Sequence, residues 1–312
     1  MENYLITGGA GFVGSNIVDT LLAQGEFVRV LDNFSTGKWE NIDRHMQNHR
    51  FELVDGDLRD FDIVRKASNG MDFILHQGAL PSVPRSIIDP ISTNEVNVLG
   101  TLHVLQAARE HKIKRVVYAA SSSVYGNNPT LPKEESMPPM PLSPYALAKY
   151  AGERYCQLFH ELYGLETVSL RYFNIFGPKQ DPSSQYSAVI PLFINQIRRG
   201  ESPVVFGDGL QSRDFTYVEN NVRANLLACK APGVAGKVFN VACGQRYTLN
   251  NLVGYLNQIM GTSVQAIYQD ERAGDVKHSH ADISLAQNHL GFKVSVGFYD
   301  GLVKTVNYFK NL

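Results

Sequence analysis

Cysteine is scarce in this sequence, and neither sign of charge is in excess. The three cysteines, Cys156, Cys229 and Cys243, lie far apart in a chain of 312 residues and form no C-x-x-C pair. An odd, scattered set of this kind excludes a disulfide framework and fits reduced thiols in the cytoplasm. Lysine and arginine number 29 against 30 acidic residues, a formal net charge of −1. We expect no nucleic-acid partner, because no basic excess is present to neutralise phosphates.

Long hydrophobic runs are also missing. No stretch reaches the roughly 18 apolar residues of a membrane-spanning helix. The chain enters a strand-like segment at Tyr4 with no signal-peptide pattern before it. We therefore expect no membrane partner and a cytoplasmic protein. The length suggests two domains of roughly 150 residues each.

Short β-branched runs alternate with helical segments through the first half of the chain. The expected strands are 4–7, 27–32, 51–54, 73–76, 115–120 and 167–171, and helical periodicity marks 16–23, 96–109 and 145–162. Strands separated by helices predict an α/β fold, a Rossmann-type doubly wound parallel sheet.

The pattern changes near residue 174, where a smaller C-terminal α/β substrate domain is expected. A helix near 188–199 and strands near 203–206 and 238–241 follow. We expect residues 1–173 to form the dinucleotide-binding domain, with 219–243 returning to it. Residues 174–218 and 244–312 would then form the substrate domain.

Glycines gather directly after the first expected strand. Gly8 precedes a G-x-G-x-x-G spacing at Gly9, Gly11 and Gly14, and a helix follows. These glycines permit a tight turn, a close approach of the backbone to a pyrophosphate and close packing of the helix. The amides at the start of the helix would bind the phosphates.

Asp32 ends the second expected strand, where an acidic side chain accepts hydrogen bonds from ribose hydroxyls and repels a 2′-phosphate. This position predicts NAD rather than NADP, although Lys38 leaves NADP open.

A tyrosine and a lysine four residues apart begin the helix expected at 145–162. Tyr145 and Lys149 would share one face of it. A lysine ammonium and the positive nicotinamide ring would lower the pKa of the tyrosine from about 10, so that it can take a proton from a carbinol while hydride leaves for the cofactor. Ser121, Ser122 and Ser123 follow the fifth strand, at the sheet edge where ligands bind.

These segments together resemble the extended short-chain dehydrogenase/reductase superfamily, and within it NAD-dependent nucleotide-sugar 4-epimerases. The resemblance implies Ser121, Tyr145 and Lys149 as catalytic residues and NAD as a retained hydride carrier. It implies NAD contacts at Gly8, Gly11, Phe12, Val13, Asp32, Asn33, Asp57, Leu58, Gln77, Ala79, Tyr145, Lys149 and Tyr172. It also implies a homodimer formed through a four-helix bundle of the helices near 96–109 and 145–163.

The resemblance further implies a UDP-sugar substrate that is oxidised transiently at C4. The implied contacts are Ser82, Val83, Arg85, Ser123, Asn174, Ala188, Val189, Val204, Phe206, Arg213, Arg272, Asp275 and Ser279. The segments 82–86 and 180–182 would be loops beside the sugar.

Ser279 stands where epimerases restricted to UDP-glucose and UDP-galactose carry a tyrosine. A serine leaves room for an N-acetyl group, as in bacterial UDP-N-acetylglucosamine 4-epimerases. We expect UDP-GlcNAc and UDP-GalNAc to be interconverted, with UDP-Glc and UDP-Gal as further candidates.

Three other interpretations compete with this one. A 4,6-dehydratase would carry an Asp-Glu pair at positions 122 and 123, and a UDP-glucuronate decarboxylase a glutamate at position 123, where this chain has serines. A non-catalytic NAD-sensing protein would not need Ser121, Tyr145 and Lys149 together. A metal site at His278 and His280 lacks a third ligand at suitable spacing, so no metal is expected.

Overall fold

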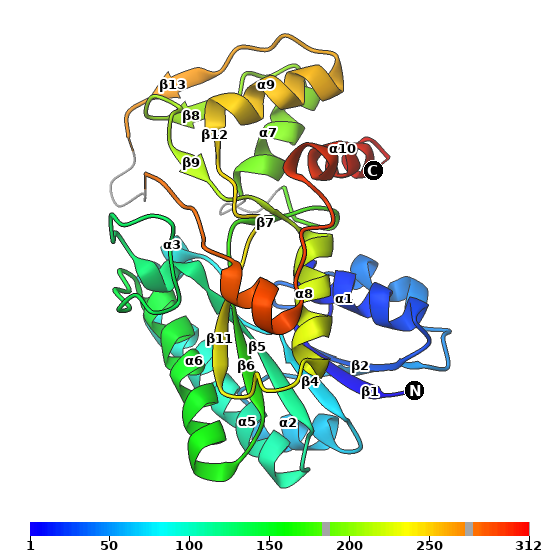
Figure 1. The fold of residues 1–312 in the computed structure, drawn as a ribbon. Coiled ribbons are helices and arrows are strands. Elements are labelled where there is room, and N and C mark those ends of the chain that lie inside the picture. The colour runs from blue at the N-terminus through cyan, green and yellow to red at the C-terminus, as the bar shows by residue number, and fades with distance from the viewer. Residues whose placement is uncertain (183–187, 272–276, 312) are drawn as a thin grey trace.

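A seven-stranded parallel sheet forms the centre of the computed structural model, which describes residues 1–182, 188–271 and 277–311 (Figure 1). The strand order is β11-β6-β5-β4-β1-β2-β3. The strands are β1 (Asn3–Thr7), β2 (Phe27–Asp32), β3 (Phe51–Asp55), β4 (Phe73–His76), β5 (Arg115–Ser121), β6 (Thr167–Tyr172) and β11 (Lys237–Val241). Each of the seven strands expected here forms within a residue of its predicted ends, which confirms the Rossmann-type α/β fold.

Helices cover both faces of this sheet because consecutive strand residues point to opposite sides. In β5, Val116 belongs to one buried cluster and Val117 to the other. One face packs against α1 (Phe12–Ala23) and α8 (Val218–Lys230). The other packs against α2 (Phe61–Ser68), α5 (Gly100–Glu110) and α6 (Pro144–Tyr163). The order of strands reverses between β1 and β4, the point at which such sheets bind ligands.

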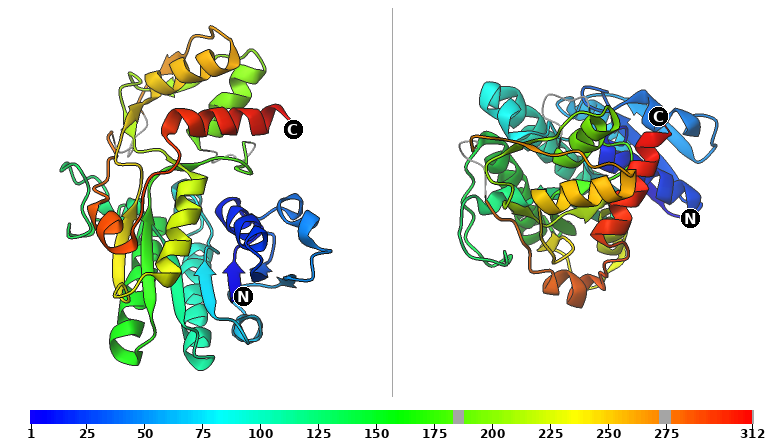
Figure 2. Two further views of the ribbon diagram at one scale, coloured as in Figure 1. Left: turned by 45° about the vertical axis from the view of Figure 1, so that its right-hand side comes forward. Right: turned by 90° about the horizontal axis from the view of Figure 1, so that it is seen from above.

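The second region lies over the carboxyl ends of the central strands (Figures 1 and 2). Its strands form short pairs: β7 (Ile175–Phe176) with β10 (Thr216–Tyr217), β8 (Val204–Phe206) with β13 (Ile267–Gln269), and β9 (Ser212–Arg213) with β12 (Tyr247–Thr248). Its helices are α7 (Val189–Arg198), α9 (Leu249–Met260) and α10 (Phe298–Lys310). Aromatic rings join these elements, and Phe215 stacks on Phe298 with centroids 5.1 Å apart.

Shorter elements lie between the main strands and helices, and two of them correct predictions. They are η1 (Trp39–Asn41), η2 (Asp43–His45), α3 (Val83–Ile88), α4 (Pro90–Asn94), η3 (Glu95–Leu99), η4 (Ser122–Tyr125) and η5 (Ala286–Leu290). The segment 82–86 is a helix start rather than a loop, because the Ser82 hydroxyl accepts from the Arg85 amide and caps α3. The helix expected at 96–109 begins in the π-helical η3. Within the described ranges, no helix has the length and apolarity to cross a bilayer.

Candidate active site

The turn between β1 and α1 is so tight that glycine is required at two of its positions. Gly8 has a φ of 68°, in the left-handed region. A Cβ on Gly14 would lie 2.1 Å from the Gly8 carbonyl oxygen, so no other residue fits there without moving the backbone. The turn therefore holds the start of α1 directly against the end of β1.

Gly11 is less crowded than Gly14. A Cβ there would meet only the Gly8 carbonyl oxygen, at 3.2 Å. Gly11 caps α1 with no side-chain hydrogen bond, so no capping side chain occupies the first-turn amides, which include those of Phe12 and Val13. Free amides at the positive end of a helix dipole fit a pyrophosphate.

Asp32 lies beside this turn at the end of β2. Its carboxylate accepts hydrogen bonds from the amides of Ala10 and Phe34, each 2.9 Å long. Burial raises the pKa of this carboxyl. Lys38, which left NADP open in the sequence, forms an ion pair with Asp181 at 3.1 Å. The Lys38 ammonium is thus already paired with a carboxylate in the structure.

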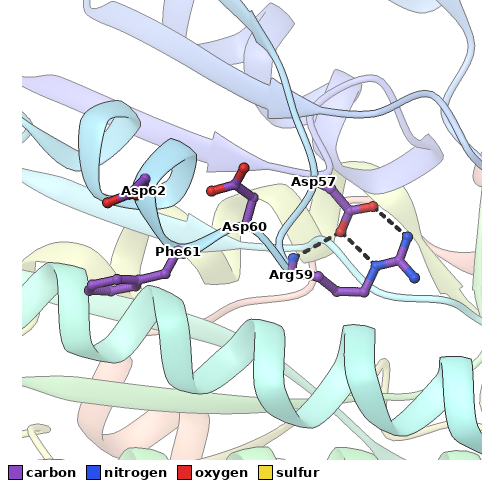
Figure 3. Close-up of a pocket in the computed structure, with 5 residues that line it drawn as sticks. All are labelled: Asp57, Arg59, Asp60, Phe61 and Asp62. Carbon is purple, nitrogen blue, oxygen red and sulfur yellow. Dashed lines mark hydrogen bonds and ion pairs between the residues drawn. The ribbon is translucent and has the colours of Figure 1, made fainter.

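Asp57 follows β3 at the rim of a shallow pocket (Figure 3). Its carboxylate accepts from the Arg59 guanidinium at 2.8 Å and from the Asn33 amide group at 2.8 Å. The Arg59 guanidinium lowers the pKa of Asp57 to about 2, so the side chain is ionised. Leu58 is buried next to it. The structure thus joins Asn33 and Asp57, two of the predicted NAD residues.

A second group of predicted NAD residues meets at the ends of β4 and β6. The Tyr172 hydroxyl donates to Gln77 Oε1 or Asn225 Oδ1, at 3.1 and 2.9 Å. Gln77 Nε2 donates to the same Asn225 oxygen at 3.1 Å. Asn225 is fully buried on α8 and was not predicted, because no motif in the sequence marks it. Ala79 follows in the half-buried segment after β4.

His76, also missed, connects the glycine turn to the neighbouring helix. Its ring nitrogens lie 2.6 Å from Thr7 Oγ1 and 3.0 Å from Thr101 Oγ1. Burial, with a smaller contribution from the Lys149 charge, lowers the pKa of His76 to about 3. The ring is therefore neutral and acts as a buried hydrogen-bonding spacer.

The predicted catalytic residues lie together at the end of β5 and the start of α6. The Ser121 side chain lies beside the Tyr145 hydroxyl and opposes the rise in its pKa that burial causes, and the Ser123 hydroxyl donates to Ser121 Oγ at 2.9 Å. Ser143 caps α6 by accepting from the Ala146 amide at 3.1 Å, which fixes the helix start that carries Tyr145. The arrangement provides a line of three hydroxyl groups able to pass a proton.

Lys149 is buried one turn further along α6, and its ammonium donates to the Ala119 carbonyl at 2.8 Å. Burial lowers the pKa of Lys149 to about 8. Burial also raises the pKa of Tyr145, while the hydrogen bond with Ser121 opposes this. The prediction that Lys149 lowers the pKa of Tyr145 does not hold in this structure, because desolvation dominates and the ammonium is bound to a carbonyl.

A buried ion pair, again unpredicted, anchors α6 to the sheet. Glu153, one turn beyond Lys149, accepts from Arg171 Nε and Nη2 of β6 at 2.8 and 2.7 Å. Arg171 Nη1 donates to the Tyr125 hydroxyl at 2.8 Å, which in turn donates to Asn240 Oδ1. The sequence hides this pair because its partners come from separate elements.

On the substrate side, Asn174 has a φ of 39° and donates from Nδ2 to the Ser279 hydroxyl at 3.4 Å. The same group lies 3.2 Å from the Asp214 carbonyl oxygen. Arg213 donates to the Ser212 and Lys277 carbonyls at 3.0 and 3.1 Å. The structure thus brings Asn174 and Ser279 into contact.

Asp214 ties the loops of this site together and was not predicted. Its buried carboxylate accepts from the amides of Cys243, Gly244 and Ala281 at 2.9, 3.1 and 3.2 Å. Burial raises its pKa to about 6, although these hydrogen bonds favour the ionised form.

The remaining predicted substrate residues are spread over the second region and α3. Ala188 precedes α7, Val189 begins it, and Val204 and Phe206 bound β8. Ser82, Val83 and Arg85 lie at the start of α3. Arg272 and Asp275 fall outside the described residues. The structure itself does not bring all of these residues into one set of contacts.

His278 and His280 have separate partners. His278 Nδ1 lies 2.9 Å from the Ser212 hydroxyl, and His280 Nε2 lies 3.1 Å from the Gly244 carbonyl oxygen. In the part of the chain that the structure describes, no three His, Cys, Asp or Glu side chains are grouped to hold a metal.

A model of the NAD dependent epimerase/dehydratase family matches residues 4–242. The chain belongs to this family. The UDP-N-acetylglucosamine 4-epimerase of Methanobrevibacter ruminantium, solved with UDP-N-acetylmuramic acid, is 42% identical, with 99% of this chain and 98% of that one covered and a TM-score of 0.95. The UDP-glucose 4-epimerase of Thermus thermophilus, solved with NAD, is 35% identical, with 99% of both chains covered and a TM-score of 0.89. The UDP-glucose 4-epimerase of Mycolicibacterium smegmatis is 36% identical over 98% of both chains.

As an enzyme of this NAD-dependent epimerase family, the protein uses NAD. The structure fits that cofactor at the glycine turn, where no side chain caps the first turn of α1 and where Asp32 lies beside the turn. A 2′-phosphate would meet that carboxylate instead of a free lysine.

Proposed function

We propose that this epimerase interconverts UDP-N-acetylglucosamine and UDP-N-acetylgalactosamine, with the plain UDP-hexoses as further substrates. The observation that carries the proposal is the contact between Ser279 and Asn174, 3.4 Å between Oγ and Nδ2. In the nucleotide-sugar 4-epimerases that the chain resembles, the position of Asn174 contacts the diphosphate. A small side chain beside it leaves space for a 2-acetamido group. The likeness to the M. ruminantium enzyme supports this choice.

The chemistry assigned to the side chains follows from the hydroxyl line at the end of β5. When bound, NAD supplies the acceptor that takes up hydride from the sugar C4 and returns it. Tyr145 takes the 4-hydroxyl proton, and its contact with Ser121 gives that proton a path between sugar and base. Ser123 orients Ser121 by donating to its oxygen. Lys149 is the third proposed catalytic residue, one turn from Tyr145 on α6 with its ammonium on the Ala119 carbonyl.

Retention of the nucleotide completes the cycle. An epimerase has to release and rotate the oxidised sugar without losing UDP. Arg213 and Asn174 are the proposed diphosphate contacts, and the described loops around them are held by Asp214. We expect these loops to give UDP a fixed site through the cycle.

A lyase is the rival enzyme class within the same family. Loss of water or CO₂ needs carboxyl acid–base groups beside the catalytic hydroxyl. Here η4 begins with Ser122 and Ser123, and Ser123 is hydrogen-bonded to Ser121. These side chains favour oxidation and reduction at one carbon. Mass spectrometry separates the two classes, since epimerisation leaves the substrate mass unchanged.

The test uses purified protein and each N-acetylated sugar with no added reductant. We expect the two sugars to interconvert. Ser279→Tyr should abolish conversion of the N-acetylated pair and spare that of UDP-galactose, whereas Ser279→Ala should keep both. No turnover of N-acetylated sugars by wild type would refute the assignment. Equal effects of Ser279→Tyr on both sugar classes would refute the role given to Ser279.

We further propose a cytoplasmic homodimer joined through the helices near α5 and α6. The large apolar side chains Leu99, Leu147 and Leu162 are 41%, 56% and 66% exposed there. Burying such residues between two copies would remove them from water. Analytical ultracentrifugation should show a dimer that Leu147→Asp converts to monomer; a monomeric wild type would contradict the proposal.

A further inference from the structure

The segment 178–182 continues from Asn174 of the substrate side and crosses to the cofactor half of the enzyme. The Asn16 side chain of α1 donates to the Pro178 carbonyl at 3.2 Å. Lys179 has a φ of 70°, in a region that a lysine rarely adopts. A strained backbone of this kind persists only where the surrounding contacts hold it. Its side-chain contacts therefore identify what the segment is held against.

Lys179 inserts its ammonium between α1 and the short helices η1 and η2. Nζ lies 2.6 Å from Asp19 Oδ2 and donates to the Asn41 carbonyl at 3.0 Å. The Lys179 side chain is only 10% exposed and that of Asp19 is 23% exposed. An ion pair this sheltered is less screened by solvent than one on the open surface.

A second ion pair of reversed polarity lies two residues further on. Asp181 lies 3.1 Å from the ammonium of Lys38. The segment therefore offers a cation and then an anion, and the cofactor half offers an anion and then a cation. A shift along the segment would bring like charges together, so the two pairs fix one register.

Lys38 and Asn41, the two residues of the 33–45 segment that Asp181 and Lys179 contact, are also hydrogen-bonded to the glycine turn. The Lys38 amide and the Asn41 side chain each donate to the Ala10 carbonyl, at 3.0 and 2.8 Å. The amide of Ala10 donates to Asp32. Holding Lys38 and Asn41 from the other side thus keeps the chain after Asp32 pressed against the turn that binds the cofactor phosphates.

We propose that Lys179 and Asp181 form a latch that slows the release of NAD. The Lys179–Asp19 ion pair fixes the 178–182 segment on α1. From there the Lys38–Asp181 ion pair and the hydrogen bond from Lys179 to the Asn41 carbonyl hold the 33–45 segment beside the glycine turn, so its opening is opposed by both charged residues of the latch. The latch acts by position and touches no reacting atom. It rests on NAD as the cofactor of the family and not on which sugar is converted. It explains how an epimerase keeps one cofactor molecule through many cycles.

The test measures NAD release in the absence of any sugar. Purified holoenzyme is mixed with a coupled dehydrogenase that reduces free NAD, and absorbance at 340 nm reports the release rate. Lys179→Met combined with Asp181→Asn should accelerate release about tenfold, the effect of about 1.4 kcal/mol. Lys230→Met is the control, because it removes an ion pair with Glu2 at the end of β1 opposite the glycine turn. It should release NAD at the wild-type rate.

A charge swap distinguishes the ion pair from general loosening. Lys38→Asp alone places two carboxylates together and should accelerate release. The double variant Lys38→Asp with Asp181→Lys restores an ion pair and should return the rate toward that of wild type. Wild-type release from the Lys179→Met, Asp181→Asn protein would overturn the proposal, as would no recovery in the swap. A failed sugar assignment leaves these rates unchanged, so the two failures are separable.

Discussion

Replacing Lys149 by methionine should stabilise the folded protein while removing a proposed catalytic charge. The side chain is 5% exposed, and its one hydrogen bond in the described structure goes to the Ala119 carbonyl. At pH 7 the lysine is charged in the unfolded chain and in the folded one, whose pKa is about 8. The folded protein therefore carries a buried ammonium that methionine, of similar length, would not.

The magnitude follows from the lowering of the pKa from 10.5 to about 8. At about 1.4 kcal/mol per pH unit, the burial of the charge costs about 3 kcal/mol at pH 7. Methionine leaves the Ala119 carbonyl without its donor, which costs about 1 kcal/mol. The net gain is about 2 kcal/mol. Because the folded state loses the lysine proton before the unfolded state does, wild type recovers this difference as the pH rises from about 8 toward 10.5.

Urea unfolding of both NAD-free proteins at pH 7 and pH 9.5 measures this effect. We expect Lys149→Met to be more stable by about 2 kcal/mol at pH 7 and by less than about 1 kcal/mol at pH 9.5. Lys304→Met gives the baseline for losing an exposed lysine. The reasoning would be refuted if Lys149→Met were less stable than wild type at pH 7. It would also be refuted if the difference in the free energy of unfolding were the same at pH 7 and pH 9.5.

Three further predictions concern groups that hold the site. Glu153→Gln leaves Arg171 buried without its counter-charge, so urea midpoints should report a loss of roughly 3–5 kcal/mol; a loss below about 1 kcal/mol would count against the pair's role. Asp214→Asn removes a carboxyl whose pKa burial raises to about 6. The folded state keeps that proton longer than the unfolded chain, so wild type loses about 3 kcal/mol relative to the variant as the pH rises from about 4 to about 6; parallel pH profiles would contradict this. Gly14→Ala places a Cβ 2.1 Å from the Gly8 carbonyl oxygen, so the purified variant should contain little NAD by absorbance at 260 nm, and wild-type content would refute the steric reasoning.

Local patterns in the sequence predicted the sheet and the cofactor turn well. Strands such as 27–32 and 73–76 form at their predicted ends, because runs of β-branched residues between helices have few other ways to bury both faces. The turn at Gly8 was predictable because its backbone excludes other residues. Tyr145 and Lys149 share a helix as their spacing required.

Contacts between distant segments were not predictable in the same way. Asn225 meets Tyr172 across 53 residues, and Lys179 meets Asp19 across 160. No local periodicity records such partners, since they depend on how the second region returns to the sheet. The pKa of Tyr145 was misjudged for a related reason: helix spacing does not reveal that the lysine ammonium binds a strand carbonyl.

The position of β11 at the sheet edge has a consequence for synthesis of the chain. β11 pairs with β6, so Val241 lies beside Tyr172. The ribosome adds the whole 174–218 segment after β6 and before β11. A nascent chain that ends before β11 therefore exposes the backbone edge of β6, which is open to pairing with other chains. The sheet is completed only late in translation, and we expect stalled or truncated products to aggregate rather than to survive as a free dinucleotide-binding half.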